Sequence, residues 1–521
     1  MYTVLRQKNS HVSLRKKPAK RSFPFGLSSF FLCLSSFFLC ISLFFLSACS
    51  DDTVPERPDV EVPSYISVNV SAQRTTTGGT PSGGEDGDGR EDGEDRENQI
   101  SEITILIYPK PADGLGINTP AAEQITVRAF CWKVNKVVNG EEETDARSEN
   151  EDVKYTTGTH PLPDSLAFGA YELLVVANED LTQELDNRSL AVVRNYVVNR
   201  EPFDRNDASQ TGVEYDPSKY TNFVLSSQQP VDIVVGNGAG HHGSGTREDP
   251  YVPTTNPVPL ERLAARIDFV PDADNTHWNA ADSTYDYPVY DAADNVVATF
   301  KLEYCCPFNL VQQQYLFKHT TTLKDTTTIN YCGRETYEEI NGLRFATNYV
   351  IDPQTYSSST EELVGDYFYP DLYHRTLTEN TVALKARFPV KPSGQLKGPD
   401  NNGRRYYILG YSAENTHTFE KLHDNAVPYS SYIAGIRIYG RYVRKGQTVD
   451  DATYVPFDWY IRHSAPDGRA DISRPLTFAL VRNNIYRIYI SKIHAIDGDF
   501  HVEFKVNVVP WQRYEHAEIP L

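Results

Sequence analysis

Few residues in this chain stand in a pattern that could do chemistry. The string GYSAE at 410–414 comes nearest to the turn Gly-x-Ser-x-Gly that exposes a nucleophilic serine, but it ends in glutamate. His241 and His242 are adjacent in a glycine-rich stretch, without further ligands at the spacing of a metal site. The pair Glu338 and Glu339 is typical of a solvated surface. We therefore expect no enzyme, no metal and no cofactor.

Cys49 has the clearest chemical setting. A basic stretch up to Arg21 is followed by an uncharged apolar run at 27–48, and the run ends in Leu-Ser-Ala-Cys49. Basic, apolar and small-residue regions in this order are typical of a secretory signal. The last four residues are similar to the bacterial lipobox, in which the chain is cut before a cysteine that then receives lipid. We predict a signal peptide at 1–48 and lipid on Cys49; an uncleaved membrane anchor or a plain secretory signal is the alternative.

A strand is predicted to stand alone after the lipid site. Ile66, Val68 and Val70 alternate with serine and asparagine, which is the period of a strand with one buried face. Residues 75–98, behind it, are rich in glycine and acidic residues and hold no aliphatic residue, so burial cannot repay the entropy of ordering them. Residues 49–98 are thus predicted to be a tether, a strand and an acidic linker.

The rest of the chain predicts a mainly β fold in two domains. Short β-branched and aromatic runs alternate with turn residues, and long helical periods are scarce, which is typical of antiparallel sandwiches. The clearest runs are 103–108, 125–132, 171–177 and 231–235, then 260–270, 406–410, 432–443, 454–462, 485–493 and 500–511. A glycine-rich loop at 236–245 and a proline-rich stretch at 250–259 mark the boundary. We expect domains at 99–257 and 258–521.

The cysteines do not form a disulfide framework. Two of the seven leave with the signal and one is Cys49, so four remain in the mature chain. A bridge between Cys332 and either Cys305 or Cys306 is compatible with export, whereas buried thiols are the other interpretation.

Several segments, in their order along the chain, resemble the fimbrillin family, the subunits of the Bacteroidetes type V pilus. They are the lipobox, the run at 103–108, Leu-Val-Val-Ala-Asn at 174–178, Arg-Leu-Ala-Ala-Arg-Ile-Asp-Phe at 262–269, the run at 482–490 and Val-Asn-Val-Val-Pro-Trp at 506–511. The resemblance implies two tandem transthyretin-like antiparallel β-sandwich domains, preceded by a lipoprotein signal and a propeptide strand. It also implies trimming by an Arg-specific protease and assembly by strand exchange.

The resemblance gives roles to arginines and to the isolated strand. If the strand around Val68 completes the first sandwich, its removal opens an edge that another chain must fill. The candidate cleavage sites are Arg74, Arg90 and Arg96, and Arg74 is favoured because it directly follows the strand.

The C-terminal ten residues, 512–521, are the candidate donor strand. Tyr514, Ala517, Ile519 and Leu521 are available as apolar anchors, while Pro520 removes one hydrogen-bond donor. The tail could instead be the last edge strand of the second sandwich.

The formal charge of −20 excludes a general nucleic-acid binder. The expected partners are other pilus subunits, joined by strand exchange, and the outer membrane, joined through lipid on Cys49 before processing. The function we expect is a structural subunit of a surface pilus. The alternatives are a fimbrial tip adhesin with a host or bacterial surface ligand, and a surface glycan-binding lipoprotein.

Overall fold

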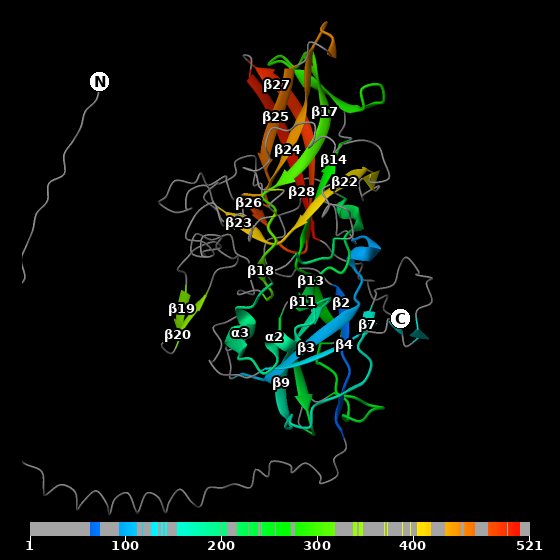
Figure 1. Ribbon diagram of the computed structural model, residues 1–521, viewed down its shortest axis with the longest axis vertical. Coiled ribbons are helices and arrows are strands. Elements are labelled where there is room, and N and C mark those ends of the chain that lie inside the picture. The colour runs from blue at the N-terminus through cyan, green and yellow to red at the C-terminus, as the bar shows by residue number, and fades with distance from the viewer. Residues whose placement is uncertain are drawn as a thin grey trace, which may run out of the picture. The chain divides into compact units, whose positions relative to one another are not determined.

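Two large β-sheets dominate the computed structural model (Figure 1). The structure describes residues 63–72, 93–111, 127–133, 154–198, 201–205, 216–227, 229–237, 242–255, 257–271, 277–317, 404–417, 433–449, 453–463, 478–496 and 499–510, with short pieces between them. All of them belong to one compact unit, Val62–Leu521. Within these residues, no helix has the length and apolar character needed to cross a bilayer. The predicted signal at 1–48 lies outside them.

Within the described residues, the first sheet has eight strands. Their order is β4 (Arg128–Lys133), β3 (Glu102–Pro109), β9 (Gly169–Ala177), β11 (Leu225–Ser227), β13 (Val258–Arg262), β2 (Asn69–Ala72) and β7 (Lys154–Thr156), with β12 (Val231–Val235) also paired to β9.

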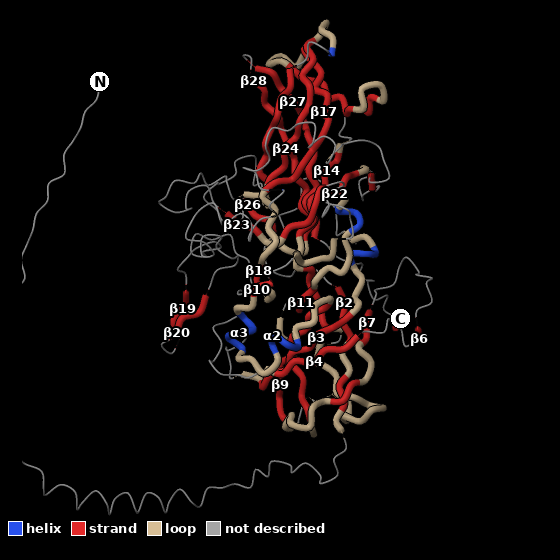
Figure 2. The backbone as a smooth tube through the Cα atoms, in the orientation of Figure 1, coloured by secondary structure: helices blue, strands red, loops and turns tan. Residues whose placement is uncertain are grey.

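The first sheet buries side chains on both faces, because successive residues of a strand point to opposite sides. Along β3, Ile103, Ile105 and Ile107 enter one apolar cluster, whereas Leu106 and Tyr108 enter another. Two short helices, α2 (Thr182–Leu185) and α3 (Leu190–Arg194), follow β9 in the chain (Figure 2), and Leu185, Leu190 and Val193 on them enter the second cluster. The sheet is therefore the middle layer of a packed domain.

In the part of the chain that the structure describes, the second sheet has ten strands. Their order is β21 (Leu396–Lys397), β22 (Tyr406–Ser412), β14 (Ala265–Val270), β27 (Asn484–Ile496), β16 (Thr284–Tyr290), β17 (Val296–Phe308), β24 (Gly435–Arg444) and β25 (Thr453–Tyr460); β15 (His277–Asn279) pairs with β16 and β28 (Asp499–Pro510) with β27. Its core is rich in tyrosine and phenylalanine. Gly435 lets the ring of Phe308 lie against the β24 backbone, where a Cβ would collide with it.

The remaining elements are short. The two-stranded pairs are β1 (Tyr65–Ile66) with β8 (His160–Pro161), β10 (Val197–Val198) with β18 (Gln314–Tyr315), β19 (Tyr337–Ile340) with β20 (Leu343–Ala346), β23 (Asn415–His417) with β26 (Phe478–Leu480), and β5 (Val137–Val138) with β6 (Glu141–Glu142). The 3-10 helices are η1 (Asp95–Glu97) and η3 (Pro217–Lys219).

The mainly β prediction is confirmed, and the strongest predicted runs become β3, β9, β12, β27 and β28. The sequence predicts antiparallel pairing, but some pairs of strands run parallel. β2 runs parallel to β13, and β27 runs parallel to both β14 and β16. Strands that are far apart in sequence can pair in either direction, because no hairpin turn fixes them.

The predicted run at 260–270 divides between the two sheets. β13 ends at Arg262 in the first sheet, and β14 begins at Ala265 in the second. The change of sheet thus falls a few residues after the domain boundary expected from the proline-rich stretch.

Candidate functional site

The isolated strand predicted around Val68 forms two short strands, β1, which pairs with β8, and β2, which lies in the first sheet. We call residues 64–72 the leader strand. Ile66, Val68 and Val70 are 2%, 0% and 0% exposed, while Ser67 and Asn69 between them are half-buried. This is the burial pattern that the alternation predicts. The three aliphatic side chains enter the same apolar cluster as Ile103 and its neighbours on β3.

The second half of the leader strand, β2, lies inside the sheet. It pairs in parallel with β13, with Val70 opposite Val258, and antiparallel with β7 on its other side. Both rows of its backbone groups therefore face protein strands. If β2 left, β13 would present an unpaired edge beside the apolar cluster.

The first half of the leader strand is held by backbone hydrogen bonds. The Tyr65 N–H donates to the Gly245 carbonyl, and the Tyr251 N–H donates to the Tyr65 carbonyl, both at 2.9 Å. Ser67 N–H also donates to the Tyr251 carbonyl at 2.9 Å. Because all these bonds are between main chains, they fix the position of an extended strand whatever its side chains are.

On the opposite side, the 157–162 segment binds the leader strand. The Thr157 N–H donates to the Val68 carbonyl at 2.9 Å, and the Val68 N–H donates to Thr157 Oγ1 at 3.0 Å. The Leu162 N–H donates to the Ser64 carbonyl at 2.7 Å. We call the groove formed by β13, β7, this segment and the loop before Tyr251 the strand seat.

The glycine-rich loop has a role that its sequence did not reveal. The sequence predicts a hairpin or a connection between domains at residues 236–245, and in the structure Gly245 also contributes a wall of the strand seat. Gly245 has a φ of +76°, and a Cβ there would collide with the Tyr251 ring. The positive φ and the close ring both require glycine at this position.

Most of the other predicted site residues lie outside the described part of the chain. They are Cys49, Arg74, Arg90, Tyr514, Ala517, Ile519, Leu521 and Cys332. Cys305 and Cys306 are buried on β17, opposite Ile438 and Arg437 of β24. Burial raises the pKa of the Cys305 thiol well above its usual value, so this thiol stays protonated. Among the described residues, no cluster could hold a metal ion.

Arg96 is described, and its side chain lies in a polar cluster with only 15% exposure. Its Nη1 donates to the Tyr220 carbonyl at 2.5 Å, and its Nη2 donates to the Tyr411 hydroxyl at 2.8 Å. Its Nε donates to Glu94 Oε2 at 2.7 Å. The composition of the stretch up to residue 98 predicts a linker that burial cannot order, whereas Arg96 is held in the interior.

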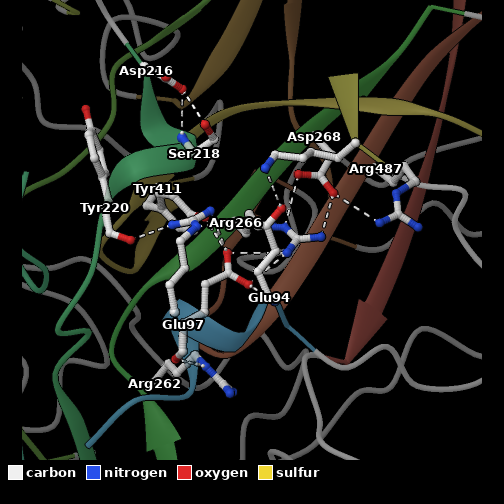
Figure 3. Close-up of polar contacts among 12 residues, drawn as sticks. Glu94, Glu97, Asp216, Ser218, Tyr220, Arg262, Arg266, Asp268, Tyr411 and Arg487 are labelled. Carbon is white, nitrogen blue, oxygen red and sulfur yellow. Dashed lines mark hydrogen bonds and ion pairs between the residues drawn. The ribbon is translucent and has the colours of Figure 1, made fainter. Parts of the chain in front are cut away.

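Glu97 is the fully buried acid at the centre of this cluster (Figure 3). Arg266 Nη1 lies 3.0 Å from its Oε2, and the Tyr411 hydroxyl donates to its Oε1. Burial opposes its ionisation, but the charges of Arg266 and Arg96 outweigh that cost and hold the pKa of Glu97 below its usual value. Glu97 is therefore a carboxylate at neutral pH.

The cluster continues into the second sheet through Asp268. Arg266 donates to both oxygens of this carboxylate, at 3.1 and 3.0 Å, and Arg487 Nη2 donates to Oδ2 at 3.1 Å. Tyr406 lies against both guanidinium groups, 5.4 Å from that of Arg266 and 4.4 Å from that of Arg487. Sequence analysis missed these residues, since only the fold brings them beside Glu97.

Comparison with known proteins gives structural neighbours only. No family model matches the chain. No curated protein matches it. It is similar to the solved structure of the tip fimbrial protein Mfa3 from Porphyromonas gingivalis, with 14% identity, 86% of this chain and 99% of that chain covered, and a TM-score of 0.34.

Two further neighbours are putative cell adhesion proteins. One is from Parabacteroides distasonis, with 13% identity, 87% and 100% coverage and a TM-score of 0.39. The other is from Bacteroides eggerthii, with 10% identity, 86% and 96% coverage and a TM-score of 0.34. Because their TM-scores are below 0.5, we infer the function from the strand seat and not from these neighbours.

Proposed function

We propose that the chain is a structural subunit of a surface pilus or fimbrium. It is exported as a lipoprotein, held at the outer membrane through Cys49, trimmed by an Arg-specific protease after Arg74, Arg90 or Arg96, and polymerised by donor-strand exchange. The single observation that carries the proposal is the strand seat filled by the leader strand.

The leader strand is suited to be a temporary occupant. Residues 73–101 separate it from β3, the next strand of its sheet, so one cut in that stretch would separate it covalently from the domain that it completes. Its three buried side chains contribute roughly 5 to 9 kcal/mol, at about 1.5 to 3 kcal/mol each. Once cut, the strand is no longer held at high local concentration, and another strand can replace it.

The C-terminal tail has the pattern that the strand seat requires. Ala517, Ile519 and Leu521 repeat the two-residue spacing of the leader strand's apolar side chains, and Tyr514 adds a further anchor. A tail that enters the seat of the next subunit makes a head-to-tail contact, which extends into a fibre instead of closing.

The test is assembly of the exported protein into SDS-stable ladders on a gel. Deleting residues 512–521 should abolish the ladder while the monomer stays folded. The substitution Ile519→Asp should do the same, because it places a charge in the apolar cluster, whereas the matched control Glu518→Gln should retain the ladder. A chain without its tail that still polymerises would refute the proposal.

A tip adhesin is the second candidate, and the same experiment identifies it. A tip subunit accepts a donor strand and offers none, so its tail would be dispensable while it still joined a ladder made by another subunit.

A further inference from the structure

Residues 94–98, which we call the clasp segment, form a compact turn between the leader strand and β3. η1 occupies its centre, and the Glu97 N–H donates to the Glu94 carbonyl at 2.8 Å. The Glu94 N–H in turn donates to Glu97 Oε2 at 2.5 Å. Glu97 and Asn98 are 0% and 3% exposed. Hydrogen bonds therefore hold the backbone on both sides of the Arg96–Glu97 peptide bond in place.

The clasp segment binds residues of both sheets. Arg262 at the end of β13 donates from its Nε to the Glu97 carbonyl at 3.0 Å, and Arg262 is itself fully buried. Arg266 of β14 and Tyr411 of β22, both in the second sheet, bind the Glu97 carboxylate. Lys397 of β21 lies 3.3 Å from Glu94 Oε1.

The side chain of Arg96, like that of Glu97, is held by several hydrogen bonds. Its guanidinium meets a backbone carbonyl, a hydroxyl and a carboxylate at 2.5 to 2.8 Å, and it lies 5.8 Å from the Tyr411 ring centroid. An Arg-specific protease must take the arginine side chain into its own pocket and hold the neighbouring residues in an extended form. Arg96 could meet both requirements only after leaving Tyr220 and Tyr411 and unwinding η1.

We propose that the clasp segment fastens the two sheets together, and that the Arg96–Glu97 bond is closed to Arg-specific proteases in the folded chain. Any trimming then leaves residues 94–98 in the product. This inference narrows the processing step of the proposed function, because it removes Arg96 from the three candidate sites. Arg96, which the sequence places in an acidic linker, thus has a structural role in the fold.

The test is digestion of the purified full chain with an Arg-specific protease, with new N-termini read by mass spectrometry. We expect a product that begins at Glu97 to form readily from the urea-denatured chain. From the folded chain it should form at least about a hundredfold more slowly, because cleavage must wait for local opening. Similar rates in both states would overturn the proposal.

A substitution tests the clasp itself. Tyr411→Phe keeps the ring but removes the hydroxyl that joins Arg96 and Glu97, and it should raise folded-state cleavage at Arg96 by about tenfold. The matched control is Tyr454→Phe on β25, where the side chain is 53% exposed, and it should leave the rate unchanged. Protection that Tyr411→Phe does not weaken would overturn the clasp.

The digest needs no polymerisation, so its outcome is separate from that of the ladder experiment. A missing ladder would refute the pilus subunit and leave the protection of Arg96 intact. Rapid cleavage at Arg96 would refute the clasp and leave the ladder unaffected.

Discussion

Replacing Val68 with alanine should loosen the leader strand without disturbing the second sheet. Val68 is 0% exposed, and the change removes two buried methyl groups, worth about 0.8 kcal/mol each, and leaves a small cavity. We expect a loss of about 2 kcal/mol in the stability of the seated strand. Since about 1.4 kcal/mol is a factor of ten, the seat should open about thirtyfold more often.

Hydrogen–deuterium exchange measures this opening directly. The amides of Thr157 and Leu162, which donate to the Val68 and Ser64 carbonyls, should exchange about thirtyfold faster in Val68→Ala. The Ile461 amide, bonded to the Ala434 carbonyl near the second sheet, should not change.

The control is Ser67→Ala, whose side chain lies between the buried positions and is half-buried. It should alter exchange in the strand seat by less than about twofold, as is usual for substitutions away from the core. Unchanged exchange at Thr157 and Leu162 in Val68→Ala, or an equal increase at Ile461, would refute the assignment of these side chains to a locally opening seat.

Three further perturbations test the seat, the clasp and a second buried ion pair. Gly245→Ala should speed exchange of the Tyr251 amide, because alanine is strained at a φ of +76° and its Cβ collides with the Tyr251 ring. Gly446→Ala is the control: Gly446 has a φ of +86° but open space around it, so this change causes backbone strain without a collision. Acid should weaken the clasp, since a carboxylate with a lowered pKa stabilises the fold above its unfolded pKa and that contribution is lost as pH falls through the folded value. Unfolding curves between pH 6 and pH 3 should therefore depend less on pH in Glu97→Gln than in the parent, and parallel curves would contradict this. Breaking the buried ion pair of Arg482 and Glu414, 2.7 Å apart, with Glu414→Gln should lower the unfolding free energy by about 3 kcal/mol, whereas Glu248→Gln on an exposed loop should not change it.

The alternation of apolar and polar residues was enough to predict the leader strand's buried face. Ile66, Val68 and Val70 are core residues because a strand with this period has only one way to bury them. The same reasoning located β3, β9 and β27, where β-branched residues cluster. The local pattern of apolar and polar residues was therefore enough to locate these strands along the chain.

The partners of those strands could not be read from the sequence. β2 and β13 are far apart in the chain and pair in parallel, a choice that no turn residue encodes. Arg96 shows the same limit, because its neighbours in sequence are acidic and predict a solvated linker. Its contacts with Tyr411, 315 positions away, with the Tyr220 carbonyl and with the buried Glu97 make it part of the interior.

The central claim is that the leader strand and a neighbour's strand occupy the same seat in turn. The most direct measurement is mass spectrometry of the N-terminus of the protein in its SDS-stable multimers. We predict that the multimers begin after Ala72 and before Glu94, so that the leader strand is absent and the clasp segment is present. Multimers that retain Ile66 to Val70 would contradict the account, because the seat would already be filled.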